Sequence, residues 1–342
     1  MICYFVCSQH QYTIGHFLAG WGEVMADRVA VVPYESLVGR PTIPAASCYI
    51  FSDVERLTPT RLAVAIRIRE HLEAANVGAK TSDAPRLLNH PVRTCRRYEL
   101  LKMLHEKGVN DFRVHRLDES PESWRYPVFL RIENDHGGSR TQLLHDPPAV
   151  QQAMADLRQA GVRLDEVIAT EFCDTSVESG IHRKYGAFVV GRQIIPRHLM
   201  FGSQWMLKEP ELWDDQLRDE QRTYLETNPH AAALREICAD AGVDYGRVDY
   251  GIVDGQVRVW EINTNPLIQQ QVYQTQRDPY THELFSDRIR KAFEELAAGP
   301  VPKDLPKLRL NASLAARIFC ERASGWGRRR ARTLLNAMRG QA

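Results

Sequence analysis

The stretch RVDYGIVDGQVRVWEINTNP, residues 247–266, decides the fold, because it is typical of two β-strands joined by a tight Asp-Gly turn. The second strand is mostly apolar. Glu261 and Asn263 nevertheless lie two residues apart in it and therefore point to the same face. A carboxylate and an amide on one face of an apolar strand, followed at once by Asn-Pro, indicate a polar site beside a buried sheet.

The geometry of the turn determines which residues share that face. If the Asp-Gly pair alone forms the turn, Asp249 pairs with Trp260 and faces away from Glu261. A three-residue loop over 253–255, with its glycine in the left-handed conformation, instead places Arg247 opposite Glu261. In that register Asp249 lies diagonally from Glu261, at roughly 7–8 Å along the backbone. The shared face then carries Arg247, Asp249, Glu261 and Asn263.

Two interpretations of this face remain open from spacing alone. Two carboxylates and an amide form an oxygen-only cluster of the kind that Mg²⁺ prefers. Alternatively, Arg247 simply neutralises Glu261 in an ion pair.

Size and composition indicate an ordinary soluble protein of two or three domains. The chain has 342 residues, of which 44% are hydrophobic and 25% charged. No apolar run reaches the roughly 18 residues of a membrane span, and the first residues lack the pattern of a signal peptide. Seven cysteines, an odd number without a Cys-x-x-Cys pair, predict reduced thiols in a cytoplasmic protein.

The net charge of +1 conceals an uneven distribution. Residues 300–342 carry ten Lys/Arg against two acidic residues, so they have a net charge of +8 and the rest of the chain −7. This basic tail could contact an anionic partner or surface, or it could pack on the acidic body of its own chain.

Strands that alternate with helices predict an α/β protein, and we divide it into four segments. These are an N-terminal α/β domain at 1–84, a central subdomain at 85–168, a C-terminal subdomain at 169–299 and the basic tail at 300–342. In the first segment Thr60 is expected to cap a helix over 61–77. In the second, a helix is expected from 96 to 107, ended by Gly108.

A polar loop follows the apolar strand 126–133 and precedes a second expected strand at 141–145. Its Gly137-Gly138-Ser139 sequence offers backbone amides that can hold phosphate oxygens, although such glycines also serve plain turns. Arg131 is placed to bind a phosphate beside this loop, unless it is only a solvated strand end.

Charged residues also mark the ends of later strands. Glu171-Phe172-Cys173 could offer backbone groups to an adenine and a carboxylate to a ribose hydroxyl. Lys184 opens the next strand and could serve a phosphate or an acidic substrate, or be solvated. From proximity along the chain, the substrate pocket is expected to involve Arg197, His198, Trp205 and residues 269–271.

The order of these segments resembles the ATP-grasp superfamily from about residue 85 to 295. Glutathione synthetase, D-alanine–D-alanine ligase and RimK-type ligases belong to that superfamily. The most specific match is residues 247–266, similar to the metal-binding strand pair of the family. The resemblance implies that Asp249, Glu261 and Asn263 bind Mg²⁺, that Glu261 bridges two ions, and that Arg247 lies near the phosphates or the substrate carboxylate.

The less specific matches to the family concern residues that would contact the nucleotide. The resemblance implies nucleotide contacts from Arg96 or Arg97, Arg131, Gly137, Gly138, Ser139, Glu171, Phe172 and Cys173. Arginine stands at two places where the family usually has lysine, which keeps the charge but not the shape. In KYGAFVVG, residues 184–191, Gly186 occupies the position of a RimK-type arginine, and Lys184 would supply the charge.

The resemblance implies an ATP-grasp fold in which the nucleotide lies between two β-layers. It also implies an ATP-dependent carboxylate–amine ligase that forms an acyl phosphate, with ATP and Mg²⁺ (or Mn²⁺) as cofactors and small carboxylate and amine molecules as substrates. An ATP-grasp phosphotransferase and a nucleotide-binding scaffold without activity remain alternatives. A homo-oligomer is compatible with each of them.

Overall fold

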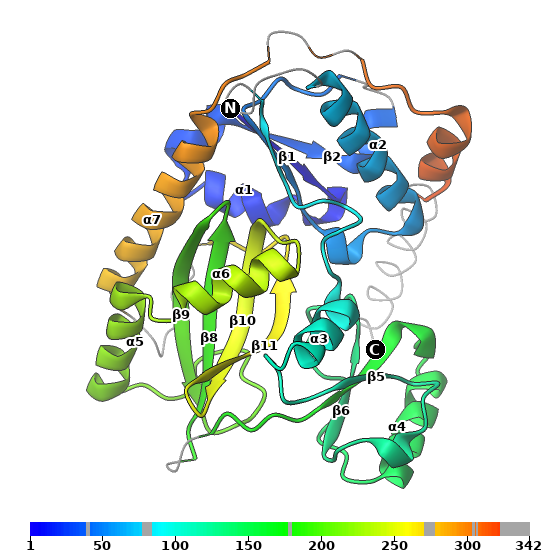
Figure 1. Ribbon diagram of the computed structural model, residues 1–342, viewed down its shortest axis with the longest axis vertical. Coiled ribbons are helices and arrows are strands. Elements are labelled where there is room, and N and C mark those ends of the chain that lie inside the picture. The colour runs from blue at the N-terminus through cyan, green and yellow to red at the C-terminus, as the bar shows by residue number, and fades with distance from the viewer. Residues whose placement is uncertain are drawn as a thin grey trace, which may run out of the picture.

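The computed structural model describes residues 1–38, 42–76, 84–176, 180–269, 278–302, 305 and 307–321. Within these residues the chain forms one parallel sheet and two antiparallel sheets with helices packed on them, which confirms the expected α/β class (Figure 1). Strand β7 (Val167–Glu171) crosses the expected boundary between the central and the C-terminal subdomain, which lies between residues 168 and 169. In the part of the chain that is described, no helix is both long and apolar enough to cross a bilayer.

The N-terminal sheet is parallel, with strand order β2-β1-β3-β4. Its strands are β1 (Ile2–Val6), β2 (Val29–Pro33), β3 (Cys48–Phe51) and β4 (Arg86–Leu88). Alternate residues of β1 enter two different cores, so this strand is buried on both faces. Helices α1 (Tyr12–Leu18) and α7 (Pro279–Ala297) contribute to one core, and α2 (Pro59–Ala75) to the other.

Two details of this region correct the expectations from the sequence. Thr58, not Thr60, caps α2, because Pro59 takes the first helical position, where its missing N–H costs nothing. Part of the expected basic tail at 300–342 also packs on the N-terminal domain. Residues 312–321 form a helix, and the side chains of Leu308, Leu314 and Ile318 are buried in the same core as α2. The arginines from Arg322 onward lie outside the described residues, so the tail's partner stays a prediction.

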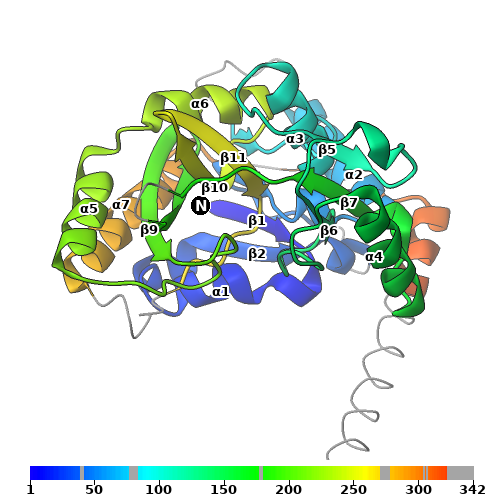
Figure 2. The ribbon, with the colours of Figure 1, turned by 90° about the horizontal axis from the view of Figure 1, so that it is seen from below.

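The two antiparallel sheets lie side by side, with helix α3 (Arg97–Glu106) between them (Figures 1 and 2). The smaller sheet has the order β5-β7-β6, with β5 at Val114–Arg116 and β6 at Val128–Ile132, and α4 (Pro147–Gln159) packs on it. The expected strand at 141–145 is wrong: only an isolated bridge joins Leu144 to Val128.

The larger antiparallel sheet has the order β11-β10-β8-β9. Its strands are β8 (His182–Val190), β9 (Gln193–Gly202), β10 (Tyr245–Val253) and β11 (Gln256–Asn263). Helices α5 (Asp215–Thr227) and α6 (Ala231–Asp240) bury their apolar side chains against one face. The Asp249/Glu261 pair of β10 and β11 lies where this sheet meets the smaller one.

Candidate active site

The β10–β11 hairpin brings Asp249 and Glu261 directly opposite each other, by a route that differs from the expected one. Asp254 and Gly255 alone form the turn, and both have positive φ (50° and 72°), so the three-residue loop is wrong. A bulge next to Asp249 then leaves Trp260 without a counterpart and shifts the register by one residue. The bulge restores the shared face that the tight turn alone would have lost.

Glu261 is buried among three basic side chains. Its Oε2 accepts hydrogen bonds from Arg97 Nη2 at 2.5 Å and Arg131 Nη2 at 2.7 Å, and its Oε1 lies 3.4 Å from His136 Nδ1. Burial alone would raise the pKa of this carboxyl group, but Arg97, His136 and Arg131 outweigh burial and hold its pKa well below the ordinary range. Glu261 is therefore a carboxylate.

Asp249 is neutralised by a different pair of cations. Arg247 donates to both of its oxygens, at 2.7 and 3.1 Å, and Lys184 Nζ lies 2.9 Å from Oδ2. Burial opposes ionisation here as well, yet Arg247 and Lys184 lower the pKa of Asp249 below its ordinary value. The alternative of an Arg247–Glu261 ion pair is thus wrong, because Arg247 lies opposite Asn263 and binds Asp249.

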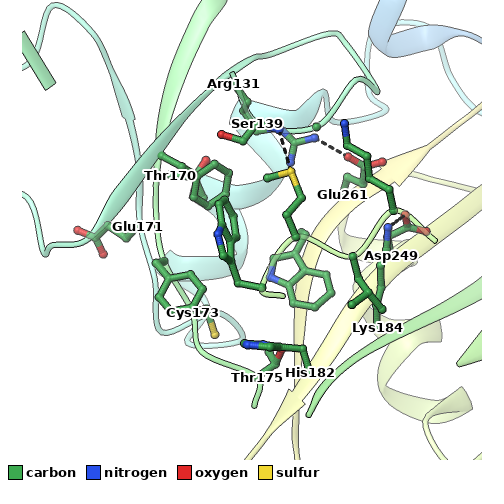
Figure 3. Close-up of a pocket in the computed structure, with 18 of the residues that line it drawn as sticks. Arg131, Ser139, Thr170, Glu171, Cys173, Thr175, His182, Lys184, Asp249 and Glu261 are labelled. Atoms are coloured by element: carbon green, nitrogen blue, oxygen red, sulfur yellow. Dashed lines mark hydrogen bonds and ion pairs between the residues drawn. The ribbon is translucent and has the colours of Figure 1, made fainter. Parts of the chain in front are cut away.

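The two carboxylates border a cavity of about 140 Å³ between the antiparallel sheets (Figure 3). The opposite part of its wall is aromatic. The ring of Trp205 lies 5.0 Å from that of Phe129 and 5.8 Å from that of Phe172, measured between ring centroids. One end is therefore suited to a flat heterocycle and the other to charged groups.

The polar loop after β6 borders this cavity, and two of its three expected amides have partners within the chain. The Gly137 N–H donates to Asp135 Oδ1 at 2.9 Å, and the Ser139 N–H points to the sulfur of Met206 at 3.4 Å. Gly138 has φ +87°, and a Cβ there would lie 2.8 Å from Cε of Lys208. This glycine therefore allows Lys208 to reach the loop, where its Nζ donates to the Gly137 carbonyl at 2.7 Å. Sequence reasoning missed Lys208, because nothing in the spacing of the segment 203–214 indicates where it folds.

Of the two candidate arginines at the start of α3, only Arg97 contacts a residue that lines the cavity, although it does not line the cavity itself. Arg97 contacts Glu261 and also donates to the carbonyls of Glu133 and Asp135, so it fixes the loop after β6. Arg96 instead donates to the carbonyl of Leu57 at 3.2 Å. Arg96 is the N-cap residue with extended φ and ψ, whereas Arg97 is the first helical residue, so their side chains leave the backbone in different directions.

Glu171 does not offer its carboxylate to the cavity as expected. The carboxylate accepts hydrogen bonds from Arg113 Nε and from the backbone N–H groups of Arg113 and Arg125, and His115 Nε2 lies 3.1 Å away. Burial opposes its ionisation, but His115 and the N–H donors lower the pKa of Glu171 to about 2. Glu171 nevertheless lines the cavity together with its neighbours Phe172 and Cys173.

Replacing Glu171 with glutamine should lower the free energy of unfolding by about 3 kcal/mol at pH 7. The pKa is about 2 in the folded state and near 4.5 in the unfolded state, so this stabilisation is present above about pH 4.5 and lost as the pH falls toward 2. Urea unfolding at pH 7, 5 and 3.5 should show that the difference in unfolding free energy between wild type and E171Q decreases as the pH is lowered. The exposed Glu122→Gln, in the segment just before β6 of the same small sheet, is the control and should change little. If the difference in unfolding free energy between wild type and E171Q did not change with pH, the lowered pKa of Glu171 would be contradicted.

A second cavity of about 130 Å³ adjoins the first. Lys184 and Lys208 line both cavities, and Arg247 lines the second. The expected pocket residues Arg197, His198 and Gln269 line this second cavity, whereas Trp205 lines the first; residues 270 and 271 lie outside the described residues.

Gly186 is explained by His198 rather than by a lost arginine. A Cβ at position 186 would lie 2.4 Å from His198 Nε2 and 2.6 Å from its Cε1, so the imidazole occupies the space of a side chain at 186. Lys184 places a cation beside Asp249; that it replaces the charge of the RimK-type arginine stays a prediction.

Replacing Gly186 with alanine should therefore destabilise the protein by about 1–3 kcal/mol, because the packed imidazole of His198 must move. The double variant G186A/H198A should recover most of this loss, since the clash no longer exists. Chemical denaturation of the two single variants and the double variant measures the coupling. Strictly additive losses would contradict the proposed contact.

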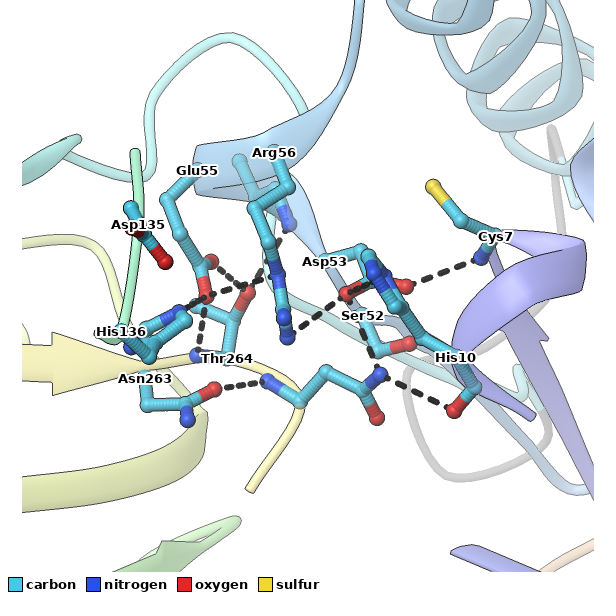
Figure 4. Close-up of polar contacts among 12 residues, drawn as sticks. Cys7, His10, Ser52, Asp53, Glu55, Arg56, Asp135, His136, Asn263 and Thr264 are labelled. Atoms are coloured by element: carbon cyan, nitrogen blue, oxygen red, sulfur yellow. Dashed lines mark hydrogen bonds and ion pairs between the residues drawn. The ribbon is translucent and has the colours of Figure 1, made fainter. Parts of the chain in front are cut away.

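A polar network links the site to the N-terminal domain (Figure 4). His136 lies between Glu261 and Glu55, with 3.1 Å from its Nε2 to Glu55 Oε1, and Glu55 accepts hydrogen bonds from Thr264. Asn265, expected only to end the strand, accepts hydrogen bonds from Tyr4 and Thr13. Contacts between residues from 81 to 261 positions apart leave no signal in local sequence patterns, so this network was missed.

Phosphate and a divalent ion both fit the residues present. Arg131, which lines the first cavity, has an Nε that is shielded from solvent and has no hydrogen-bond partner among the described residues, so the wall has a donor to offer an anion; Nε of Arg97, behind Glu261, is in the same state. Asp249 and Glu261 supply ionised oxygens on one face, and the surrounding cations exceed them in charge. Asn263 is the weakest of the expected metal ligands, because its side-chain oxygen accepts the Asn265 N–H at 2.8 Å and it lines neither cavity.

Comparison with known proteins gives structural neighbours only. No family model matches the sequence, and no curated protein matches it. An ATP-grasp RimK domain protein from Sphaerobacter thermophilus DSM 20745 shares 13% identity at a TM-score of 0.48 and covers 87% of this chain and 100% of its own. The chain is similar to ATP-grasp structures over most of its length.

Two further structural neighbours are named as ligases. D-alanine–D-alanine ligase from Bacillus anthracis, complexed with ATP, shares 13% identity at a TM-score of 0.46 and covers 86% of this chain and 99% of its own. An L-amino acid ligase from Bacillus licheniformis shares 12% identity at a TM-score of 0.41, over 77% and 66% of the two chains. Similarity at this level concerns the course of the chain and does not transfer substrates.

Proposed function

We propose that the protein is an ATP-dependent carboxylate–amine ligase. The observation that carries this proposal is the pair of buried, ionised carboxylates, Asp249 and Glu261, surrounded by an excess of cations where an aromatic-walled cavity meets a cationic one. The first cavity suits a nucleotide, with the base toward Trp205 and the phosphates toward Arg131. The second suits an acid that reacts with the terminal phosphate.

Phosphoryl transfer requires positioning and charge neutralisation more than a protein nucleophile. Arg97 and Arg131 would turn their guanidinium groups from Glu261 toward the phosphates, since charge-assisted hydrogen bonds to phosphate are at least as strong. Mg²⁺ bound by Asp249 and Glu261 would neutralise phosphate charge and align the β- and γ-phosphates. Lys184 and Lys208, which line both cavities, would hold the acid beside the γ-phosphate.

The proposed reaction has two steps. A carboxylate oxygen of the acid attacks the γ-phosphorus, and the bond to the β–γ bridging oxygen breaks with its electron pair leaving on ADP. An amine next attacks the carbonyl carbon of the acyl phosphate. Inorganic phosphate leaves with the electrons of the carbon–oxygen bond, and the amine releases a proton to solvent. The cationic wall of the second cavity would hold the carboxylate in the first step and stabilise the anionic oxygen that develops on the acyl carbon in the second.

Incubation with Mg-ATP, a mixture of carboxylic acids and a mixture of amines tests this proposal. A ligase releases ADP and phosphate only when both mixtures are present, and mass spectrometry detects an acid and an amine joined with loss of water. ADP release without any amine, with a product heavier by a phosphoryl group, would show a phosphotransferase instead. Nucleotide binding without ADP release from any mixture would show a scaffold.

A further inference from the structure

The expected set of metal ligands contains two well-placed carboxylates and one badly placed amide. Asp249 and Glu261 both line the first cavity. Asn263 lines neither cavity, and its side-chain oxygen accepts the Asn265 N–H at 2.8 Å. A histidine of the cavity wall, His136, lies next to Glu261 instead, with its Nδ1 at 3.4 Å from Glu261 Oε1. His136 is therefore a better candidate than Asn263 for the third ligand.

A carboxylate on the far side of the imidazole determines which nitrogen of His136 faces Glu261. Nε2 lies 3.1 Å from Oε1 of the buried Glu55, so Nε2 carries a proton and donates it to this carboxylate (Figure 4). Glu55 is itself held in place by Thr264, which donates to it from its hydroxyl group and its backbone N–H. A histidine that binds a metal ion through one nitrogen usually donates from the other to a carboxylate. The Glu55–His136 pair has this arrangement.

The separation of His136 Nδ1 and Glu261 Oε1 suits two ligands of one ion. With the proton on Nε2, Nδ1 is an acceptor, and two acceptors that face each other need a positive charge between them. Ligand atoms at about 2.1 Å from the same ion are about 3.0–3.4 Å apart, for octahedral and tetrahedral angles respectively. The observed separation is 3.4 Å. Without an ion a proton can take this place, and a bound ion would displace that proton.

The arginines of the site contact a different edge of the same carboxylate. Arg97 and Arg131 both donate to Oε2 of Glu261, whereas His136 faces Oε1. Glu261 can therefore bind an ion through Oε1 beside His136 while its other oxygen still faces the cationic wall.

We propose that His136 is the third protein ligand of the metal ion, through Nδ1, in place of Asn263. This inference rests on the proposed function, which places a divalent ion at Asp249 and Glu261. Glu55 is a positioning residue that orients the imidazole through Nε2. Mg²⁺ prefers oxygen ligands, so one imidazole nitrogen in the site raises the affinity for a transition-metal ion such as Mn²⁺ relative to Mg²⁺.

Pulsed electron paramagnetic resonance of bound Mn²⁺ tests this ligand without any turnover. Unlabelled protein is compared with protein in which only the histidines contain ¹⁵N, each with equimolar Mn²⁺ and a non-hydrolysable ATP analogue. The electron spin echo should be modulated by a ¹⁴N nucleus in the first sample and by a ¹⁵N nucleus in the second. Bound Mn²⁺ whose modulation does not change with histidine labelling would overturn the inference. A protein that binds no Mn²⁺ would overturn the inference and the metal assignment together.

Variants assign the nitrogen to one histidine. H136Q should lose the modulation and bind Mn²⁺ at least about tenfold more weakly, whereas Mg²⁺, which readily takes water instead, should lose less affinity. E55Q should keep the modulation and bind Mn²⁺ about tenfold more weakly, because the imidazole is no longer held by a carboxylate. H145Q, at an exposed histidine beyond the same loop, is the matched control and should behave like wild type. Unchanged modulation in H136Q would overturn the assignment.

Binding of the ATP analogue and circular dichroism show whether each variant is folded. The comparison of labelled and unlabelled wild-type protein stands even if H136Q does not fold.

Turnover distinguishes failure of this inference from failure of the proposed function. ADP release that requires both an acid and an amine, by an enzyme whose bound Mn²⁺ shows no histidine nitrogen, would support the ligase and overturn the inference. Histidine-bound Mn²⁺ in a protein that never releases ADP with acids and amines would contradict the ligase and leave the metal site standing.

Discussion

Replacing Glu261 with glutamine should reduce ATP turnover by at least about 1,000-fold. The carboxamide has the same shape but cannot provide two anionic oxygens to a metal ion. It also leaves Arg97 and Arg131 without the carboxylate that they both contact, at 2.5 and 2.7 Å. The variant should unfold more easily by about 3 kcal/mol, because buried cations lose their partner. Steady-state ADP release at saturating Mg-ATP measures the effect.

A surface ion pair provides the control for Glu261. On α2, Glu70 Oε2 lies 2.6 Å from Arg67 Nη1, and both side chains are about half exposed. E70Q should therefore keep full turnover and change stability by less than about 0.5 kcal/mol. Circular dichroism and thermal unfolding with ATP present would verify that E261Q is folded in the assay. An E261Q enzyme with more than a tenth of wild-type turnover would contradict the metal assignment.

Replacing Arg131 with methionine should raise the KM for ATP by about 100-fold and lower kcat by a similar factor. The guanidinium is buried, contacts Glu261 and has a solvent-shielded Nε without a partner in the described structure, so it is available to a phosphate. R131K keeps the charge and should retain activity within about tenfold of wild type. Initial rates over a range of ATP concentrations separate the two kinetic effects.

Arg140 is the matched control for Arg131, because it follows the same loop but is exposed and pairs with Asp135. R140M should leave both kcat and the KM for ATP nearly unchanged. If R131M and R140M behaved alike, Arg131 would have no special role toward the phosphates.

The shared face of the hairpin could be predicted from the sequence, but its register could not. Alternation placed Glu261 and Asn263 together, and Asp249 was expected to join them. The structure achieves this with a tight turn and a bulge at Trp260 instead of a longer loop. A bulge is selected by packing across several strands, which a local pattern does not contain.

Residue type at a strand end indicated where charge is needed, but not which way a side chain turns. Arg131 and Lys184 contact the two carboxylates, whereas Glu171 turns to Arg113 and His115. The direction depends on partners more than 50 residues away along the chain. The same limit applies to Lys208 and Glu55, which reach the site or its network through tertiary folding alone.

A crystal structure with Mg²⁺ and a non-hydrolysable ATP analogue tests the central claim most directly. It should show a metal ion bound by Asp249 and Glu261, the base near Trp205, and Arg131 donating to a phosphate oxygen. A nucleotide bound elsewhere, with Arg97 and Arg131 still on Glu261 and no metal at Asp249, would contradict the account.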